Sequence, residues 1–474
     1  MRARLRWQSA IFTPSRPWCG DVLRCILRPM RLLSTDPLFA WDKLPDSTEI
    51  ATLRNMLDRL PDQTLLSALR RYRGKGRNDY PMHVLWRAHL LRIMLRHPTM
   101  EDCLAELKRN PALRQVAGIE AGMNVPAPCN MSRFLEVLGR PEHLQLTEAM
   151  FGRMARLLGE AVPDLGVHLA GDSAALCARA DAPGRGQEGL PQPDGAVKQY
   201  LDDQGKVLKT YQWFGYKFHL LVDAVHEVVL AFKLTSASAA DSVQLPDLLD
   251  QAQRFLPAGR IKTLAYDKAA DNEPSHALLQ GHGIKPVIEV RNLWKDKQEE
   301  VIGGNVVHDE AGTLYCYDLT QAVPVRRKMS FMGHEKNRGT LKYRCPARHE
   351  GIPCPSDKKC NGQSCYGKTV RVKCAIDLRR FPPIPRATAE FARRYAGRTS
   401  VERVNARCKL FWGADDGNVT GAARFHAHMH GILLVHQSFA LLLATAPRHE
   451  GRSLSPTRLS VIARRLEEAT QATR

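Results

Sequence analysis

The chain has 474 residues, which is more than a single hydrophobic core usually supports, so we expect two or three domains. Its 69 Lys and Arg against 49 Asp and Glu leave a formal net charge of +20, which favours polyanionic partners, with nucleic acid ahead of an anionic membrane surface. The longest apolar run, 431–446, contains His436 and Gln437 and is shorter than the roughly 20 residues that cross a bilayer. It therefore predicts a buried helix and no membrane partner.

The amino-terminal part of the chain is basic and then helical. Residues 1–36 are rich in Arg and lack both a continuous apolar segment and a signal-peptidase pattern, so we expect a poorly ordered tail. Residues 37–163 show apolar residues at helical spacing, with helices predicted at 46–59, 84–95, 100–108 and 132–138. This is either a helical domain that binds DNA ends or a helical scaffold with a solvated basic surface.

Residues 164–291 change to an alternation of strands and helices. Strands are predicted at 167–173, 216–223, 228–234, 260–267 and 284–290, helices at 241–255 and 272–280, and a loop at 179–203. This order predicts a mixed α/β sheet flanked by helices. Asp172 and Asp267 end two of the strands, and they can lie close together only if those strands are neighbours, as they are in a ribonuclease H-like arrangement.

The rest of the chain is predicted to complete this sheet domain after an interruption. Short alternating runs and turns over 292–372 indicate a β-rich insertion. The sheet domain then resumes over 373–446 with two helices, of which the second covers 422–443, and a polar tail occupies 447–474.

The stretch 395–409 carries four polar residues on one predicted helical face. Tyr395, Arg398, Glu402 and Lys409 stand at offsets of 3, 7 and 14 residues. At about 100° per residue these positions fall within roughly 60° of arc. The face is either a site that handles phosphate or the solvated charged side of an amphipathic helix.

Together, Asp172, Asp267 and Glu402 form a set of hard oxygen ligands that suits two Mg²⁺ or Mn²⁺ ions. Two such ions activate a water or a 3′-hydroxyl on one side of a phosphate and stabilise the leaving oxygen on the other. Arg398 and Lys409 would then contact phosphate oxygens, and Tyr395 would hydrogen-bond a phosphate or stack on a base.

These residues resemble the motifs of bacterial insertion-sequence transposases of the DDE type. All four positions of the Tyr-(2)-Arg-(3)-Glu-(6)-Lys signature match, and 171–176 and 265–271 resemble the two aspartate motifs. In the second motif Ala269 and Ala270 replace the usual Gly and Tyr. The resemblance implies metal-dependent cleavage of transposon ends, strand transfer into target DNA, a homodimer on double-stranded DNA and a cytoplasmic, nucleoid-associated protein. Some relatives hold a flipped base with an aromatic residue, a role for which Trp294 is the candidate; packing at a domain junction is its alternative.

Two other groups of residues could hold a metal. Cys345, Cys354, Cys360 and Cys365 supply enough thiolates for a structural Zn²⁺, although their spacing contains no Cys-x2-Cys, and loose reduced cysteines are the alternative. His426 and His430 lie one helical turn apart with His428 between them, but packed or DNA-facing histidines are the preferred interpretation.

Two alternatives to an active transposase stay open from the sequence. A DNA-binding protein that has lost catalysis is suggested by Ala269 and Ala270 and by the amino-terminal extension. A structure-specific nuclease would use the same acids but cut DNA without rejoining it.

Overall fold

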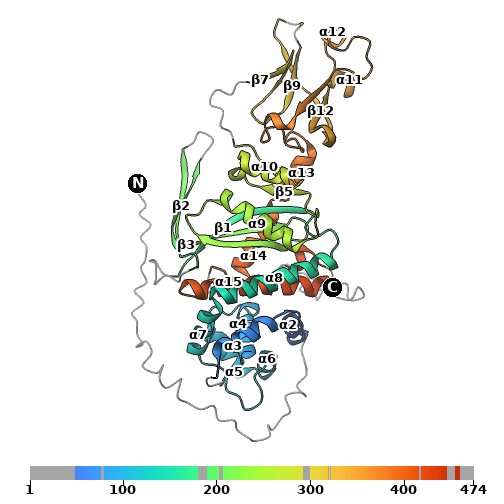
Figure 1. The fold of residues 1–474 in the computed structure, drawn as a ribbon. Coiled ribbons are helices and arrows are strands. Elements are labelled where there is room, and N and C mark those ends of the chain that lie inside the picture. Colours follow the sequence, from blue (N-terminus) through green and yellow to red (C-terminus); the bar gives the residue numbers. More distant parts are fainter. Residues whose placement is uncertain are drawn as a thin grey trace, which may run out of the picture.

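The computed structural model describes residues 48–75, 79–179, 189–201, 206–291, 299–318, 320, 322–415, 418–445 and 454–459. Figure 1 shows the amino-terminal helices at one end, a mixed sheet in the middle and a set of small sheets at the other end. The basic tail predicted over 1–36 and Trp294 lie outside the described residues.

The amino-terminal region is helical, as predicted, but it contains more helices than the apolar periodicity indicated. Local signals fix some of their ends: the Thr99 hydroxyl accepts the Asp102 N–H, and the Asp102 carboxylate accepts the Thr99 N–H. The helices are α2 (Thr48–Asp58), α3 (Gln63–Arg73), α4 (Met82–Met94), α5 (Met100–Arg109), α6 (Pro111–Ala117), α7 (Pro128–Leu138) and α8 (Pro141–Ala161).

The central sheet is mixed, and its path runs β2-β3-β1-β5-β6, with β4 beside β3. Over residues 216–223, β3 lies between β1 and β4 and is antiparallel to both, whereas β5 is parallel to β1 and β6 is parallel to β5. The strands are β1 (His168–Cys177), β2 (Asp194–Leu201), β3 (Val207–Asp223), β4 (Val229–Ser236), β5 (Thr263–Tyr266) and β6 (Lys285–Ile288). Helix α9 (Asp241–Phe255) packs on β3 and β4, and α10 (Glu273–Gly281) packs on β6.

The loop predicted over 179–203 is partly wrong, because β2 occupies Asp194–Leu201. This strand pairs only with the first half of β3, and the two form a hairpin that projects from the sheet (Figure 1). Val197 and Leu208 are exposed on it. A ribbon that no helix covers does not need one apolar face, so its sequence lacks the alternation by which strands are recognised.

The β-rich insertion contains two small sheets. One has the order β10-β9-β8-β7 and the other β11-β12-β13. Among the residues that the structure describes, their shared core has eight buried members: Val306, Leu314, Met329, Leu341, Tyr343, Val372, Cys374 and Phe381. The elements are β7 (Glu300–Gly303), β8 (Val306–His308), β9 (Leu314–Asp318), β10 (Val325–Lys328), β11 (Ser330–Glu335), β12 (Thr340–Arg344), α11 (Pro346–His349), α12 (Asp357–Asn361) and β13 (Thr369–Lys373).

The single helix predicted through 395–409 is broken in the structure. Helix α13 covers Ala389–Ala396 and α14 covers Thr399–Leu410. Between them the N–H of Gly397 bonds to the Arg394 carbonyl at 3.1 Å, and that of Arg398 to the Tyr395 carbonyl at 2.8 Å. These bonds span three residues instead of four, so a tighter turn separates the two helices.

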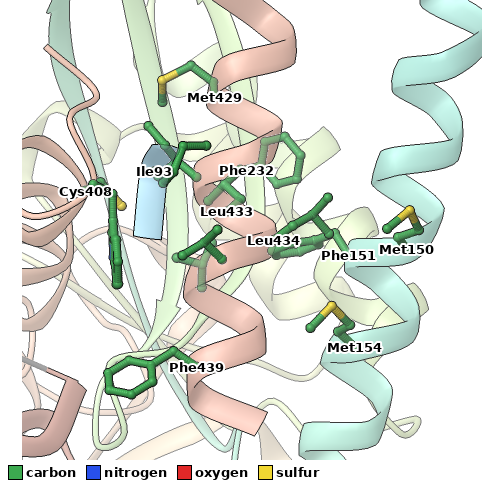
Figure 2. Close-up of a cluster of buried hydrophobic side chains, with 14 of the residues drawn as sticks. Ile93, Met150, Phe151, Met154, Phe232, Cys408, Met429, Leu433, Leu434 and Phe439 are labelled. Carbon is green, nitrogen blue, oxygen red and sulfur yellow. The ribbon is translucent and has the colours of Figure 1, made fainter. Parts of the chain in front are cut away.

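Helix α15 (Ala422–Ala444) joins the two main parts of the molecule. It packs against α2, α4, α7 and α8 and also contacts β4. Figure 2 shows Leu433 and Leu434 of α15 among Ile93, Phe151 and Phe232, which come from α4, α8 and β4. One continuous hydrophobic core therefore includes the amino-terminal helices and the central sheet. Helix α15 is long and apolar enough to cross a membrane, but 83% of its apolar window is buried inside the protein, as expected for a core helix.

Candidate functional site

The register of the sheet brings Asp172 and Asp267 to the same level of neighbouring strands. Strands β1 and β5 are parallel, and their last paired residues are Ala170 and Ala265. Asp172 lies two residues beyond Ala170, and Asp267 lies two residues beyond Ala265, directly after β5 ends. Adjacent parallel strands direct corresponding residues to the same edge. The two aspartates predicted from the sequence therefore belong to one site.

Helix α14 brings Glu402 to this site through Arg398. The helix packs on β1 and β3. The Arg398 Nη2 donates to Glu402 Oε1 at 2.6 Å, and its Nη1 lies 3.6 Å from Asp172 Oδ2. One guanidinium thus contacts a carboxylate from the sheet and a carboxylate from the helix. We call Asp172, Asp267 and Glu402 the acidic cluster.

The three acids of the acidic cluster differ in environment. The Glu402 side chain is 49% exposed, whereas that of Asp172 is 23% exposed. Burial raises the pKa of Asp172 to about 6; the negative charge of Asp267 acts in the same direction, and the Ser173 N–H and Arg398 oppose it. Asp172 is therefore a carboxylate that gains from a nearby cation.

Tyr395 and Lys409 occupy the two ends of the signature. Tyr395 is half-buried on α13, where its ring stacks on Phe391 with centroids 5.7 Å apart, and the Arg398 guanidinium lies 5.9 Å from its ring centre. Lys409 donates to the Ala175 carbonyl of β1 and lies 3.0 Å from Asp415. Lys409 therefore ties the end of α14 to the strand that carries Asp172.

Glu227, which the sequence did not single out, holds α14 in place. It lies in the turn between β3 and β4, is buried, and has a positive φ of 56°. Its two oxygens accept from Arg403 Nε and Arg407 Nη2, both at 2.5 Å. These arginines flank the turn of α14 that follows Glu402, so the pair fixes the helix against the sheet. Glu227 and Arg407 are 180 residues apart, so no local sequence pattern could have indicated this ion pair.

Asp271, the second acid of the motif 265–271, has a structural role. It is buried and accepts from His276 Nε2 at 3.0 Å, from Arg379 Nη2 at 2.7 Å and from the Arg291 N–H at 2.8 Å. Burial alone would raise its pKa, but these donors and Arg386 together hold the pKa of Asp271 below its usual range. The residue connects the end of the sheet with the segment that returns from the insertion.

The alanines at 269 and 270 fit the backbone of this motif. Asp267 caps the short helix η2 (Lys268–Ala270) by accepting the Ala269 N–H. Ala269 is not among the residues with positive φ, so no glycine is required there. Ala270 is buried in the main core. Having Ala269 and Ala270 in place of the usual Gly and Tyr therefore does not displace the carboxylate of Asp267 from the end of β5.

The histidines of α15 are packed inside the protein. His426 lies 3.3 Å from the Pro191 carbonyl, His428 lies 3.2 Å from that of Gly413, and His430 lies 2.7 Å from the Thr147 hydroxyl. Burial lowers the pKa of His426 to about 4 and those of His428 and His430 to about 3. These are neutral core histidines.

The structure changes the predicted set of zinc cysteines. Cys345, Cys354 and Cys360 line one small cavity of the insertion, but Cys365 is exposed and does not line it. Cys316 of β9 is the fourth thiol of that cavity. Cys316 is far from the other three in sequence, so the spacing 345–365 could not indicate it.

Neither the acidic cluster nor the cysteines form a finished metal site. Within the described ranges, no group of three or more His, Cys, Asp or Glu side chains is arranged to hold a metal ion as it stands. In the acidic cluster the Arg398 guanidinium occupies the place between two carboxylates where a cation is favourable. The donor chemistry fits a hard divalent ion, provided that Arg398 moves aside.

Comparisons with known proteins agree with the sequence motifs. A family described as "Transposase DDE domain" matches residues 191–437, and one described as "Transposase domain (DUF772)" matches residues 40–136. The first match contains Asp267 and Glu402 and begins after Asp172. A solved structure, the piggyBac transposase synaptic complex with hairpin DNA, is similar at 10% identity and a TM-score of 0.36, over 86% of this chain and 77% of that chain. No curated protein sequence gives a significant match.

Proposed function

Because the chain belongs to the transposase DDE domain family, we propose that it cleaves the ends of a transposon and joins them to target DNA in a cut-and-paste reaction. The acidic cluster carries this proposal. Asp172 and Asp267 lie at matching positions of neighbouring parallel strands, and Arg398 links Asp172 to Glu402.

The topology of the sheet supports a ribonuclease H-like catalytic domain. Strands β4, β3 and β1 form an antiparallel set, and β5 and β6 continue the sheet in parallel with β1. In this arrangement β1 and β5 are parallel neighbours; Asp172 lies on β1 and Asp267 directly follows β5. We propose domains at 37–163 for DNA binding, at 164–291 and 373–446 for catalysis, and at 292–372 for the insertion, with tails at 1–36 and 447–474.

Asp172, Asp267 and Glu402 would hold two Mg²⁺ or Mn²⁺ ions. When bound, these ions would activate the attacking water or 3′-hydroxyl and stabilise the leaving oxygen. The half-buried carboxyl of Asp172, with a pKa of about 6, would be mostly ionised near neutral pH and so could serve as a ligand. Arg398, which now contacts Asp172 and Glu402, would supply its guanidinium to a phosphate oxygen of the DNA.

Tyr395 and Lys409 would assist at the DNA backbone. The ring of Tyr395 is held by stacking on Phe391, and its hydroxyl, which interacts with Arg398, would contact a phosphate beside that guanidinium. Lys409 would exchange its contact with Asp415 for a phosphate. Trp294 stays the candidate for holding a flipped base. The partners are double-stranded DNA and a second copy of the chain, and the proposed location is the cytoplasm, at the nucleoid.

The test uses duplex DNA that carries the inverted repeats flanking the gene. Purified protein with Mg²⁺ should nick these ends and join them to a target plasmid. Asp172→Asn, Asp267→Asn and Glu402→Gln should each lower product formation by at least roughly 10³-fold. A gel-shift assay should show that the variants still bind the ends.

The control is Asp247→Asn, which removes an exposed carboxylate of α9 that pairs with Lys233 of β4 and has no contact with the acidic cluster among the ion pairs of the described residues. It should leave the reaction unchanged. Unaltered cleavage by Asp172→Asn would refute the assignment. End binding without any product would favour the impaired DNA-binding protein, and cleavage without joining would favour the nuclease.

A further inference from the structure

The insertion contains a cavity that is lined by four thiols from four different places. Cys316 lies on β9, Cys345 directly follows β12, Cys354 lies between α11 and α12, and Cys360 lies on α12. The cavity volume is about 20 Å³, which is room for roughly one water-sized sphere. No disulfide joins these cysteines. The four thiols therefore surround a space of the size of one ion, and we call them the cysteine pocket.

The polar groups around the cysteine pocket are suited to thiolates. The Asn361 side-chain amide donates to Cys345 Sγ at 3.4 Å, and that of Asn305 donates to Cys360 Sγ at 3.9 Å. Arg327, which is paired with Cys316 in the sheet register, also lines the cavity, as does Lys368. The carboxylates of Asp318 and Asp357 line it too, and they are paired with Arg327 at 3.7 Å and with Arg348 at 2.7 Å. Amide donors and cations beside sulfur stabilise the negative charge that a four-thiolate metal site retains.

The segment 346–368 contributes no side chain to the hydrophobic core of the insertion, and all of its residues are described. Ile352 and Tyr366 are exposed. The segment is held instead by polar contacts, among them Arg348 with Asp357 at 2.7 Å and the Lys368 N–H with Asn361 Oδ1 at 2.6 Å. A short segment without a core commonly needs a metal or disulfide to fix it.

We propose that the cysteine pocket binds one Zn²⁺ through Cys316, Cys345, Cys354 and Cys360, and that this ion fastens α11 and α12 to β9. The sulfurs do not yet lie at ligand distance. Binding draws them to about 2.3 Å from the metal by rotation of the side chains, and it releases the thiol protons to solvent. Zinc is preferred to iron–sulfur clusters because the cavity has room for a single ion.

The first test measures the metal content of the full-length protein, purified without chelator in the presence of reductant. Elemental analysis should find about one zinc per chain, and almost no iron, as a four-thiolate site requires. Cys316→Ser and Cys360→Ser should each lose most of this zinc. Cys365→Ser is the matched control, because this cysteine lies in the same segment but is exposed outside the cavity, and it should keep the metal.

A second test does not depend on how well the serine variants fold. Wild-type protein loaded with Co²⁺ in place of zinc should show the strong charge-transfer absorption of four thiolate ligands. Removal of the metal by a chelator should increase proteolytic cleavage within 346–368 severalfold and leave α15 protected.

Four results would overturn the proposal. They are zinc-free protein, iron in place of zinc, loss of zinc in Cys365→Ser with retention in Cys316→Ser, and disulfides between the four thiols under reducing conditions. Metal content is measured without DNA, and Asp172→Asn should not change it. A failure of the transposase assignment would therefore leave this result intact.

Discussion

The main core and the core of the insertion are stabilised by very different amounts of buried apolar surface. The main core includes residues of the amino-terminal helices, the central sheet, α14 and α15 and contains most of the buried apolar residues; Figure 2 shows one part of it, around α15. In the described part of the insertion, eight buried core members support two sheets and two short helices. The first region can be stabilised by burial alone, whereas the second depends on hydrogen bonds, ion pairs and, as proposed here, a metal.

The largest expected loss of stability comes from breaking the buried ion pair of Glu227 and Arg407. Glu227→Ala leaves Arg407, whose side chain is 4% exposed, without its buried carboxylate partner. An uncompensated buried charge costs about 3–5 kcal/mol, so urea unfolding should show a loss of this size. Arg403→Ala is the control: Arg403 is 54% exposed, and its pair with Glu227 should contribute less than about 1 kcal/mol. Equal losses in the two variants would contradict the buried role of Glu227.

A matched pair of buried leucines compares the two cores directly. Leu433 on α15 and Leu341 on β12 are both fully buried. Leu433→Ala should lower the free energy of global unfolding by about 2–5 kcal/mol. Leu341→Ala should mainly raise hydrogen exchange within the insertion, because a small region can open by itself. If Leu341→Ala lowered the global value as much as Leu433→Ala, the two cores would unfold as one unit.

The smallest expected change in the free energy of unfolding, counted per residue, comes from protonation of the histidines of α15. Burial lowers the pKa of His426 to about 4 and those of His428, His430 and His436 to about 3, against 6.5 in an unfolded chain. Below pH 6.5 the unfolded chain binds protons that the folded core excludes, so the free energy of unfolding falls as pH falls. The slope is about 1.4 kcal/mol per pH unit for each histidine.

Asp172 acts in the opposite direction, because its pKa is raised to about 6, and protonation between pH 6 and 3.8 favours the folded state. Four histidines outweigh this one carboxyl. Urea unfolding at pH 7.5 and pH 5 should therefore show a clear loss at the lower pH, with α15 losing its hydrogen-exchange protection. Equal stability at the two values would mean that the histidines are hydrated.

Local signals selected the candidate acids: predicted strand ends indicated Asp172 and Asp267, and helical spacing indicated Glu402 and Arg398. The strand end predicted at Asp172 was wrong, because β1 continues past this residue to Cys177, whereas Asp267 does directly follow β5. The turn at Gly397 depends on hydrogen bonds three residues apart, and the exposed hairpin partner β2 carries no apolar alternation. Glu227 with Arg407, and Cys316 with Cys360, become neighbours only through the fold, so no spacing in the sequence reveals them.

The place of α15 in the core has a consequence for how the protein is made. Its side chains fill the space between α4, α8 and β4, yet the ribosome synthesises it after all of these elements. The amino-terminal helices must therefore wait, with apolar surface exposed, until residues 422–444 emerge from the exit tunnel. A transcript broken before that point would yield a chain that cannot complete its fold, and such a product would be open to aggregation and proteolysis. Translation through α15 is thus a condition for completing the main core.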